Sequence, residues 1–321
     1  MTHETPDNDR WLIVGCGYVG KQLVERIRSQ TPNAIIYALT RSSDRCSELE
    51  SIGAQPIVGD WLEPGFCHTK LPQVDFILVS VPHRPPEADE PETENINEKH
   101  CYFRSRSNEL THVTGLENLL QTIPPDWSRL FYCSTTGVYG DDHAEPVNED
   151  TPVHPTRIGP QIAHESERWL LERIESPKLV CLRLAGIYGP QRIPHLRQLQ
   201  LGEPLAVPPQ SYLNLIHVAD IANIIFQMSQ ISQVQHPVYV LSDGQPVLRA
   251  DLYQYIASKL NLDAVSFAAP SDSVSLSKRA TSKRIDPARL VQELQYDFLF
   301  PNYRQGLEPL LEEILETSAS N

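Results

Sequence analysis

Residues 11–20 read Trp-Leu-Ile-Val-Gly-Cys-Gly-Tyr-Val-Gly and decide the fold. Apolar residues of strand character lead into a Gly-x-Gly-x-x-Gly motif, and a helical pattern follows at once. Gly15 permits the tight turn, Gly17 lets a pyrophosphate approach the backbone, and Gly20 lets the helix pack on the strand. The motif therefore predicts a dinucleotide site, the alternative being a merely structural turn, and the expected binding residues are Gly15, Cys16, Gly17, Tyr18, Val19 and Gly20.

Short apolar runs bounded by turn residues recur through the first half of the chain, as expected of parallel strands buried on both faces. The predicted strands are 11–15, 34–40, 55–59, 74–81, 129–134 and 178–184. Helical patterns separate them at 19–29, 43–51, 104–122 and about 157–175. This alternation predicts an α/β fold, a Rossmann-type doubly wound parallel sheet. We also assign Val79, in the fourth strand, to the cofactor site.

The alternation of predicted strands and helices stops after residue 185, because Gly and Pro residues interrupt the sequence pattern over 186–212. Helices are predicted at 217–230, about 249–260 and about 286–295, and a strand at 237–242. We predict a dinucleotide-binding domain over 1–185, to which 211–245 returns. The smaller C-terminal substrate lobe is then expected to comprise 186–210 and 246–321.

The composition narrows the class of partner. With 27 Lys+Arg and 41 Asp+Glu, the formal charge is −14, which disfavours binding to nucleic acid or anionic membranes. No apolar run approaches the roughly 18 residues of a membrane span, and the polar N-terminus lacks the pattern of a secretory signal. The six cysteines are scattered without CxxC pairs, so we expect no metal or disulfide framework and a cytoplasmic protein.

The end of the second strand indicates which dinucleotide binds. NAD-preferring sites carry an Asp or Glu there, whereas this chain has Leu39-Thr40-Arg41-Ser42-Ser43. The Arg41 guanidinium suits a 2′-phosphate, so we predict NADP, with NAD possible and a solvated Arg41 as the alternative. Asp60, after the third strand, is expected either to accept from the adenine amine or to cap the following turn.

Several further motifs occur in a fixed order. They are Cys-Ser-Thr-Thr-Gly-Val-Tyr-Gly-Asp at 133–141, Leu-Arg-Leu-Ala-Gly-Ile-Tyr-Gly-Pro at 182–190 and Leu-Ile-His-Val-Ala-Asp-Ile-Ala-Asn-Ile-Ile at 215–225. Over nearly its whole length the chain resembles the extended short-chain dehydrogenases/reductases, the NAD(P)-dependent epimerase/dehydratase family. That resemblance implies a Ser/Thr, a proton-donating Tyr and a Lys four residues later as the catalytic set.

Only part of that set is present. Thr135 matches the Ser/Thr position, but Arg157 stands in the tyrosine's place and Gln161 in the lysine's, and no Tyr or Lys occurs from 140 to 177. Arginine stays protonated and glutamine does not titrate, so neither runs the usual proton relay. The pattern is similar to the atypical, YeeZ-like group that lacks the Tyr–Lys dyad. An arginine that contacts the diphosphate in nucleotide-sugar members is replaced by Leu213.

Other groups could replace the missing acid/base pair. His83 follows the fourth strand, near the expected nicotinamide, and its imidazole titrates in a useful range. Tyr139 is a second candidate, Tyr188 and His164 are further ones, and a packing or surface role is the alternative for each. Arg157 is expected to clamp an anionic substrate or the cofactor.

Residues 82–98 hold four prolines and six acidic residues, which predicts a solvated loop or a lid over the carboxyl edge of the sheet. Two functions remain open. One is an NADP-dependent oxidoreductase or epimerase that acts on a small carbonyl or sugar-type molecule with non-standard acid/base residues. The other is a non-catalytic NADP(H)-binding regulatory or interaction protein. A homodimer through the helices at 104–122 and 157–175 is implied by the resemblance.

Overall fold

A computed structural model describes residues 9–63, 66, 70–83, 111–140, 145–268 and 282–319. The chain forms two compact units. The first comprises Met1–Val138, Pro155–Leu182 and Ala222–Val238, and the second comprises Tyr139–His154, Arg183–Ile221 and Tyr239–Asn321. The predicted lid segment, from residue 84 onward, lies outside the described residues.

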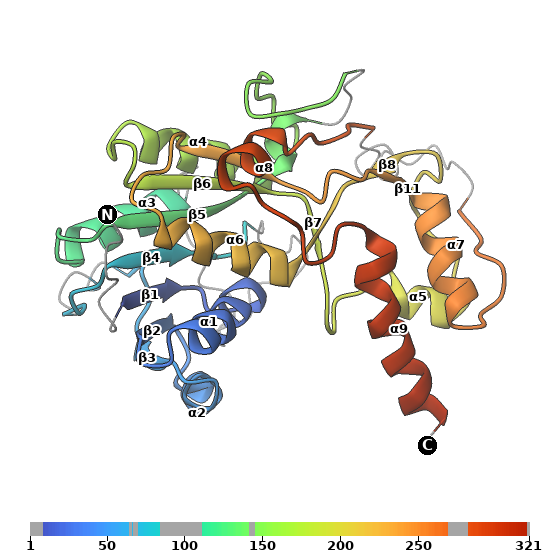
Figure 1. Cartoon of the computed structure of the whole chain (residues 1–321), viewed down its shortest axis with the longest axis horizontal. Coiled ribbons are helices and arrows are strands. Elements are labelled where there is room, and N and C mark those ends of the chain that lie inside the picture. The colour runs from blue at the N-terminus through green and yellow to red at the C-terminus, as the bar shows by residue number, and fades with distance from the viewer. Residues whose placement is uncertain are drawn as a thin grey trace, which may run out of the picture. The chain divides into compact units, whose positions relative to one another are not determined.

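A seven-stranded parallel sheet in the order β10-β6-β5-β4-β1-β2-β3 organises the fold (Figure 1). Its strands are β1 (Arg10–Val14), β2 (Ile35–Thr40), β3 (Gln55–Val58), β4 (Phe76–Val79), β5 (Arg129–Thr135), β6 (Leu179–Leu184) and β10 (Val238–Leu241). The order reverses direction at β1, because β2 pairs on one side of it and β4 on the other. Open sheets of this kind bind ligands at that switch point, so the predicted Rossmann-type fold is confirmed.

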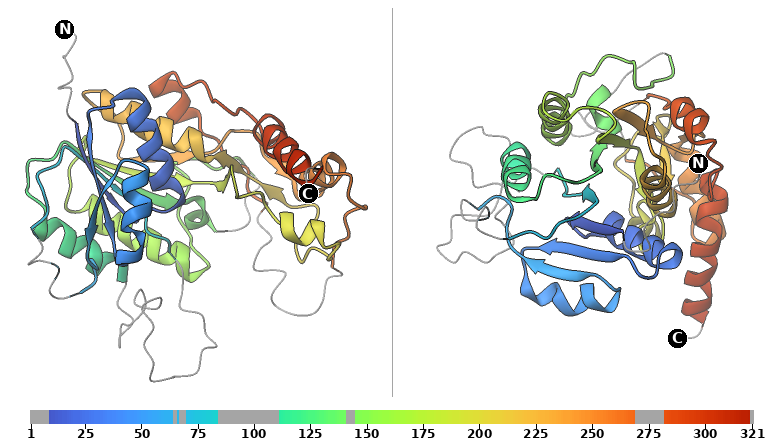
Figure 2. Two further views of the ribbon diagram at one scale, coloured as in Figure 1. Left: turned by 90° about the horizontal axis from the view of Figure 1, so that it is seen from below. Right: turned by 60° about the vertical axis from the view of Figure 1, so that its left-hand side comes forward.

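Helices cover both faces of the sheet in the first unit (Figure 2). They are α1 (Tyr18–Gln30), α2 (Cys46–Ser51) after the short helix η1 (Ser43–Arg45), α3 (Thr111–Thr122), α4 (Ile158–Leu171) and α6 (Val218–Gln230), with η4 (Thr136–Tyr139) at the end of β5. α1 buries Leu23, Val24 and Ile27, which recur at the helical period. The predicted helix at about 157–175 ends earlier, at residue 171, and the N–H groups of Arg173 and Ile174 both donate to the Leu170 carbonyl.

The second unit has its own apolar core and shorter strands. Its elements are β7 (Gly186–Tyr188), α5 (Leu196–Gln200), β8 (Tyr212–Leu213), β9 (Leu215–His217), β11 (Val247–Leu248), α7 (Arg249–Lys259), α8 (Ala288–Leu294) and α9 (Tyr303–Ala319). Leu307 and Leu311 of α9 are buried, four residues apart, against a core that includes Tyr188. A side chain at Gly306 would overlap the Tyr188 hydroxyl, so only glycine allows α9 to pack this closely on β7.

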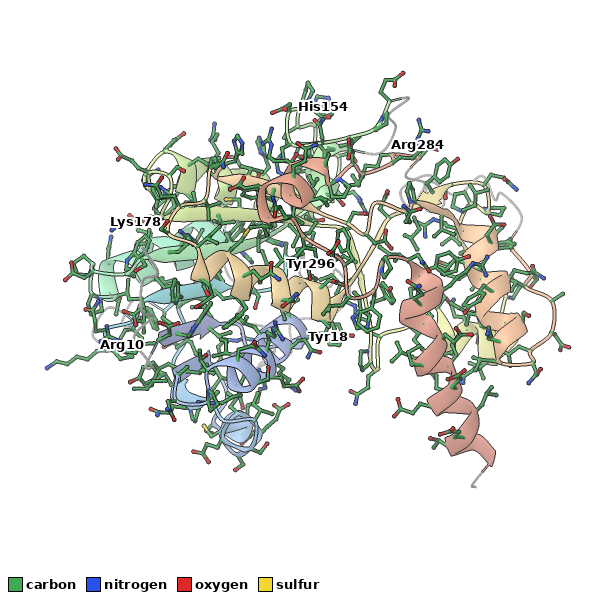
Figure 3. All side chains as sticks on the ribbon, viewed as in Figure 1. Arg10, Tyr18, His154, Lys178, Arg284 and Tyr296 are labelled. Atoms are coloured by element: carbon green, nitrogen blue, oxygen red, sulfur yellow. The ribbon has the colours of Figure 1, made fainter. Side chains whose placement is uncertain are left out.

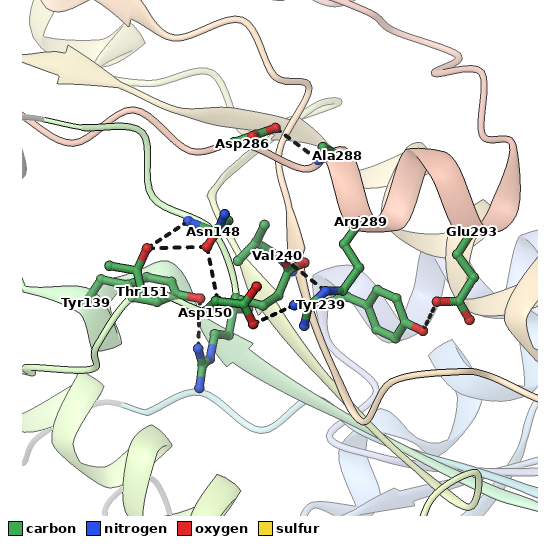
Figure 4. A network of polar contacts seen from close by, with 12 residues as sticks. Tyr139, Asn148, Asp150, Thr151, Tyr239, Val240, Asp286, Ala288, Arg289 and Glu293 are labelled. Carbon is green, nitrogen blue, oxygen red and sulfur yellow. Dashed lines mark hydrogen bonds and ion pairs between the residues drawn. The ribbon is translucent and has the colours of Figure 1, made fainter.

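Charged groups join distant segments of the second unit (Figure 4). Glu149 accepts from the Val240 N–H at 2.8 Å, and Arg289 on α8 donates to Asp150 at 2.6 Å. Tyr239 donates to Glu293 of α8 at 2.5 Å. These contacts tie α8 to β10 and to the loop around residue 150.

Candidate functional site

The glycine loop joins β1 to α1, and two of its glycines are required by close approach. Gly15 has φ +82°, and a Cβ there would lie 2.9 Å from Val81 Cγ2. A Cβ at Gly20 would lie 2.9 Å from Ile13 Cγ2. By contrast, a Cβ at Gly17 would meet nothing nearer than the Gly15 carbonyl, at 3.9 Å. Gly17 therefore leaves open space at the start of α1, where a pyrophosphate would need it.

The other residues of the loop have different environments. Cys16 is buried, and burial raises the pKa of its thiol to about 11, so it stays neutral. Tyr18 is the first residue of α1 and stands at its end in Figure 3, and Val19 is buried on the same helix. No acidic side chain lies in the first turn of α1, so its backbone N–H groups face no negative charge that would oppose a phosphate.

A pocket lies beside this loop, within the first unit. Its described lining residues are Val14, Gly15, Leu39, Thr40, Arg41, Ser42, Arg45, Gly59, Trp61 and Val81. They come from the ends of β1, β2 and β3 and from the segment after β4, which is the carboxyl edge of the sheet. Two arginines contribute to this described lining and no carboxylate does, so the pocket favours an anionic ligand.

Arg45 was missed by the sequence analysis. Its Nη2 donates to the Cys16 carbonyl at 2.8 Å, and its Nε donates to Glu48 at 3.1 Å. Lys21 of α1 donates to the same carboxylate, and these two partners lower the pKa of Glu48, with Lys21 the larger cause. The contacts of Arg45, Glu48 and Lys21 therefore connect η1 and α2 to the glycine loop and α1. The only sequence signal was a second arginine four residues after Arg41.

Asp60 and Val79 stand next to the pocket lining. Asp60 is nearly buried, and its Oδ1 accepts from the Leu62 N–H at 3.0 Å, which is the capping arrangement expected as one alternative. Val79 is fully buried in β4 opposite Val14, and Val81 reaches the pocket wall. Contact of Asp60 or Val79 with a cofactor stays a prediction.

Three of the five candidate catalytic residues lie at the ends of β5 and α4. Thr135 closes β5, and its Oγ1 accepts from the Gly137 N–H at 3.0 Å. Arg157 is the N-cap of α4 and is half-buried, whereas Gln161 is exposed. A Cβ at Gly137 would lie 2.7 Å from Pro160 of α4, so the segment after Thr135 packs directly on the first turn of that helix. The structure therefore brings Thr135 and Arg157 to one region.

His83 joins the same region through the backbone. A Cβ at Gly159 would lie 2.5 Å from the His83 carbonyl oxygen, so the chain after β4 rests on the first turn of α4. A hydrogen bond holds the His83 ring, because its Nε2 lies 2.7 Å from the Tyr132 hydroxyl. Burial lowers the pKa of His83 well below its usual range, and the neighbouring His112 lowers it further.

Tyr139 ends η4 and belongs to the second unit. It is 1% exposed, and its hydroxyl accepts from Arg183 Nη1 at 2.7 Å, with the guanidinium 4.9 Å from the ring centroid. The Tyr188 ring is fully buried in the core of that unit. Both environments are those of packed tyrosines, and an acid/base role for either stays a prediction. His164 is on α4, partly exposed.

Neither a membrane span nor a metal cluster occurs among the described residues. No helix in the described part of the chain is both long and apolar enough to cross a bilayer. Within the same ranges, no three His, Cys, Asp or Glu side chains are grouped to hold a metal ion. The cysteines that the structure describes, at 16, 46, 133 and 181, are free thiols.

Solved structures share this fold over almost the entire chain. A functionally unknown conserved protein from Silicibacter pomeroyi matches with a TM-score of 0.70 at 25% identity, covering 95% of this chain and 99% of its own. The dTDP-glucose 4,6-dehydratase of Bacillus anthracis, solved in complex with NAD, matches with a TM-score of 0.72 at 15% identity, covering 97% and 98%. The UDP-N-acetylglucosamine 4-epimerase of Bacillus cereus matches with a TM-score of 0.66 at 16% identity, covering 95% and 99%.

No curated protein matches the sequence. The model of the NAD dependent epimerase/dehydratase family does match, over residues 11–241. That range runs from β1 to β10 and includes the glycine loop, the pocket and the segments around Thr135 and Arg157. The chain belongs to the NAD-dependent epimerase/dehydratase family.

Proposed function

We propose that the protein is an NADP-dependent oxidoreductase or epimerase that acts on a small carbonyl or sugar-type substrate with non-standard acid/base residues. The observation that carries this proposal is the pocket at the end of β2, to which Arg41 and Arg45 contribute and no described carboxylate does. A 2′-phosphate carries about two negative charges and three acceptor oxygens, which a pair of guanidinium groups matches well.

The surroundings of Arg41 support a preference for NADP over NAD. An NAD site uses a carboxylate at the end of β2 to accept from the ribose hydroxyls, and here Thr40, Arg41 and Ser42 occupy that position. The next acidic residue, Asp44, is exposed on η1, and its N–H is held by the Ser42 hydroxyl at 3.3 Å. A carboxylate from this segment would oppose a phosphate, whereas the arginines attract it.

The chain's own residues fit a dinucleotide along its whole length. The loop from Gly15 to Gly20 would hold the pyrophosphate, and Arg41 and Arg45 would hold the 2′-phosphate. The bound nicotinamide would supply a hydride acceptor or donor at the carboxyl edge of the sheet. Thr135 would orient the substrate oxygen, and Arg157 would attract an anionic group on the substrate or cofactor.

The substrate class is inferred from two positions. Leu213 on β8 replaces the arginine expected of nucleotide-sugar enzymes, which argues against a nucleotide diphosphate on the substrate. Arg157 favours a carboxylate or phosphate on a smaller molecule. Arg157→Ala should then raise KM for such a substrate. The exposed Arg168, farther along α4, provides the matched control as Arg168→Ala.

A non-catalytic NADP(H)-binding regulatory or interaction protein is the second candidate. Arg157 and Gln161 favour it, because they stand where the family carries its proton-donating pair. A panel decides between the two candidates: NADP⁺ with polyols and sugar phosphates, and NADPH with aldehydes, ketones and keto acids. Stereospecific hydride transfer on any substrate supports the enzyme. Tight NADPH binding without turnover on any of them supports the regulator.

Arg41→Asp tests the cofactor assignment itself. The variant places a carboxylate where NAD enzymes have one, so NADPH affinity should fall about 100-fold or more while NADH affinity is kept or rises. Arg197→Asp, at an exposed arginine of α5, controls for the same change in net charge. Equal NADPH affinity in wild type and Arg41→Asp would contradict the assignment. Assembly as a homodimer and a cytoplasmic location remain predictions from the sequence.

A further inference from the structure

Three polar rings, those of His83, Tyr132 and His112, are connected in series by hydrogen bonds near the end of β4 in the first unit. His83 Nε2 lies 2.7 Å from the Tyr132 hydroxyl of β5, and that hydroxyl lies 3.3 Å from Nδ1 of His112 on α3. His112 Nε2 in turn lies 3.3 Å from the carbonyl oxygen of Pro82. The two imidazole rings stack with their centroids 4.4 Å apart. Tyr132 is 0% and His112 4% exposed, whereas His83 at the head of the chain is only partly buried.

The carbonyl oxygen of Pro82 sets the tautomer of His112. A carbonyl oxygen only accepts, so His112 Nε2 must carry a hydrogen, and neutral His112 Nδ1 must then accept. Tyr132 also hydrogen-bonds the Ser166 hydroxyl. We assign the Tyr132 hydroxyl proton to His112 Nδ1, because that bond supplies the donor that this nitrogen needs, and the Tyr132 oxygen then accepts from His83 Nε2–H. The result is one defined tautomer of His83, with its lone pair on Nδ1.

His83 follows β4 at the carboxyl edge of the sheet. Val81, two residues earlier, lines the pocket beside Gly15. The His83 backbone rests on Gly159 in the first turn of α4, whose next residue, Pro160, packs on the segment after Thr135. The His83 backbone thus meets the turn of α4 that packs beside Thr135, the residue that the proposed function assigns to the substrate oxygen.

We propose that His83 Nδ1 is the general base that takes the hydroxyl proton of the substrate, with Tyr132 and His112 as the positioning residues that hold it in its basic tautomer. The inference rests on the proposed function, because oxidised NADP must accept the hydride.

The proton that leaves the substrate is accounted for by the three rings. As the substrate C–H bond gives its electron pair to the nicotinamide as hydride, the O–H proton moves to His83 Nδ1. His83 Nε2 passes its proton to the Tyr132 oxygen, and the Tyr132 hydroxyl proton moves to His112 Nδ1. The substrate becomes a carbonyl compound, and the charge ends on His112, which still donates to the Pro82 carbonyl. The reverse sequence returns the proton during reduction.

Both imidazoles are neutral before the reaction. Burial lowers the pKa of His112 to about 4 and the pKa of His83 well below its usual range, and His112 adds to the lowering at His83. Burial, the largest cause, raises the pKa of Tyr132, and the hydrogen bond with Ser166 lowers it. The charge of Glu167 on α4, 1% exposed, and the thiols of Cys181 and Cys133 add smaller increases. A negative charge at Glu167 would favour the positive charge that the proton transfer leaves on His112.

Nitrogen NMR of the histidine-labelled full chain tests the tautomer without any substrate. Long-range proton–nitrogen correlations should show Nε2 protonated and Nδ1 bare in both His83 and His112 from pH 6 to pH 8. His83→Gln and His112→Gln assign the signals. In Tyr132→Phe the hydroxyl is lost, so the two nitrogen shifts of His83 should move toward each other. A proton on His83 Nδ1 in the wild type, or ordinary titration of His83 near pH 6.5, would overturn the proposal.

Cofactor fragments test where the ring lies. Saturating NADP⁺ should shift the His83 Nδ1 signal, while 2′,5′-ADP, which lacks the nicotinamide, should leave it in place. If neither compound perturbs any signal, the proposed function fails. If NADP⁺ binds and His83 does not respond, only the assignment of His83 fails. With NADP⁺ and whichever polyol or sugar phosphate proves to be a substrate, His83→Gln should lower kcat about 100-fold or more at unchanged NADP⁺ affinity. The exposed His236 supplies the control, His236→Gln.

Discussion

Arg45 Nη2 donates a 2.8 Å hydrogen bond to the carbonyl oxygen of Cys16. A side chain from the segment after β2 therefore holds the glycine loop that follows β1, and the same guanidinium contributes charge to the adjoining pocket. The bond gives the loop a second support beside the Ser80 hydroxyl, which donates to the Gly15 carbonyl at 2.8 Å.

Arg45→Ala should weaken NADPH binding about tenfold or more, because both the support of the loop and one positive charge at the pocket are lost. Titration calorimetry measures the affinity, and Arg197→Ala serves as the control. The thermal midpoint should change little, since the Arg45 side chain is 35% exposed. An unchanged NADPH affinity would show that Arg45 has no part in the site.

Gly17 and Gly20 of the loop should respond differently to alanine. Gly17→Ala should leave the free energy of unfolding nearly unchanged, because its Cβ has open space, yet remove most NADPH affinity by occupying the place of the pyrophosphate. Gly20→Ala should destabilise the fold by about 1–3 kcal/mol, because its Cβ would meet Ile13 of β1.

Urea denaturation together with NADPH titration separates these effects. The prediction is wrong if Gly17→Ala unfolds as easily as Gly20→Ala, or if Gly17→Ala binds NADPH like the wild type.

Asp243, in the second unit, should make stability depend on pH. It is 5% exposed, its Oδ1 accepts from the Gln245 N–H at 2.9 Å, and its Oδ2 has no hydrogen-bond partner among the described residues. Burial, the largest cause, raises the pKa of Asp243 from 3.8 to about 7, and Asp220 adds to it. Between these two values the folded chain holds a proton that the unfolded chain releases, so stability falls as pH rises through this range.

Asp243→Asn should remove this loss of stability with rising pH, because an asparagine side chain does not titrate. Relative to the wild type, the variant should be more stable at pH 8 than at pH 5, by about 2–3 kcal/mol across the interval. Urea unfolding at the two pH values measures the difference, and the exposed Asp263 offers a matched control as Asp263→Asn. The same stability difference at both pH values would refute this account of Asp243.

Much of the first unit was predictable from the sequence. β2 (Ile35–Thr40) was predicted at 34–40 and α1 (Tyr18–Gln30) at 19–29, because continuous apolar runs and the helical period are local signals. The strand predicted at 74–81 is shorter, Phe76–Val79, since β4 pairs with only the last four residues of β1. Of the helix predicted at 104–122, the described part is Thr111–Thr122.

The rest depends on contacts between distant residues. The strands β7, β8, β9 and β11 have two or three residues each, too short for any periodic signal. Tyr132 and His112 are far from His83 in the sequence, so no local pattern indicated the ring chain. Tyr139 is packed on Arg183, 44 residues away, which its motif did not reveal. The predicted lobe boundary at residue 185 stays a prediction.

The central claim is that the pocket at the end of β2 binds a 2′-phosphate, and the affinities of NADPH and NADH for the wild-type chain test it most directly. Calorimetric titration of both compounds in the same buffer should show NADPH binding at least tenfold more tightly. The preference should shrink as salt rises, because the arginines of the pocket act through charge. Equal affinities, or tighter binding of NADH, would contradict the account.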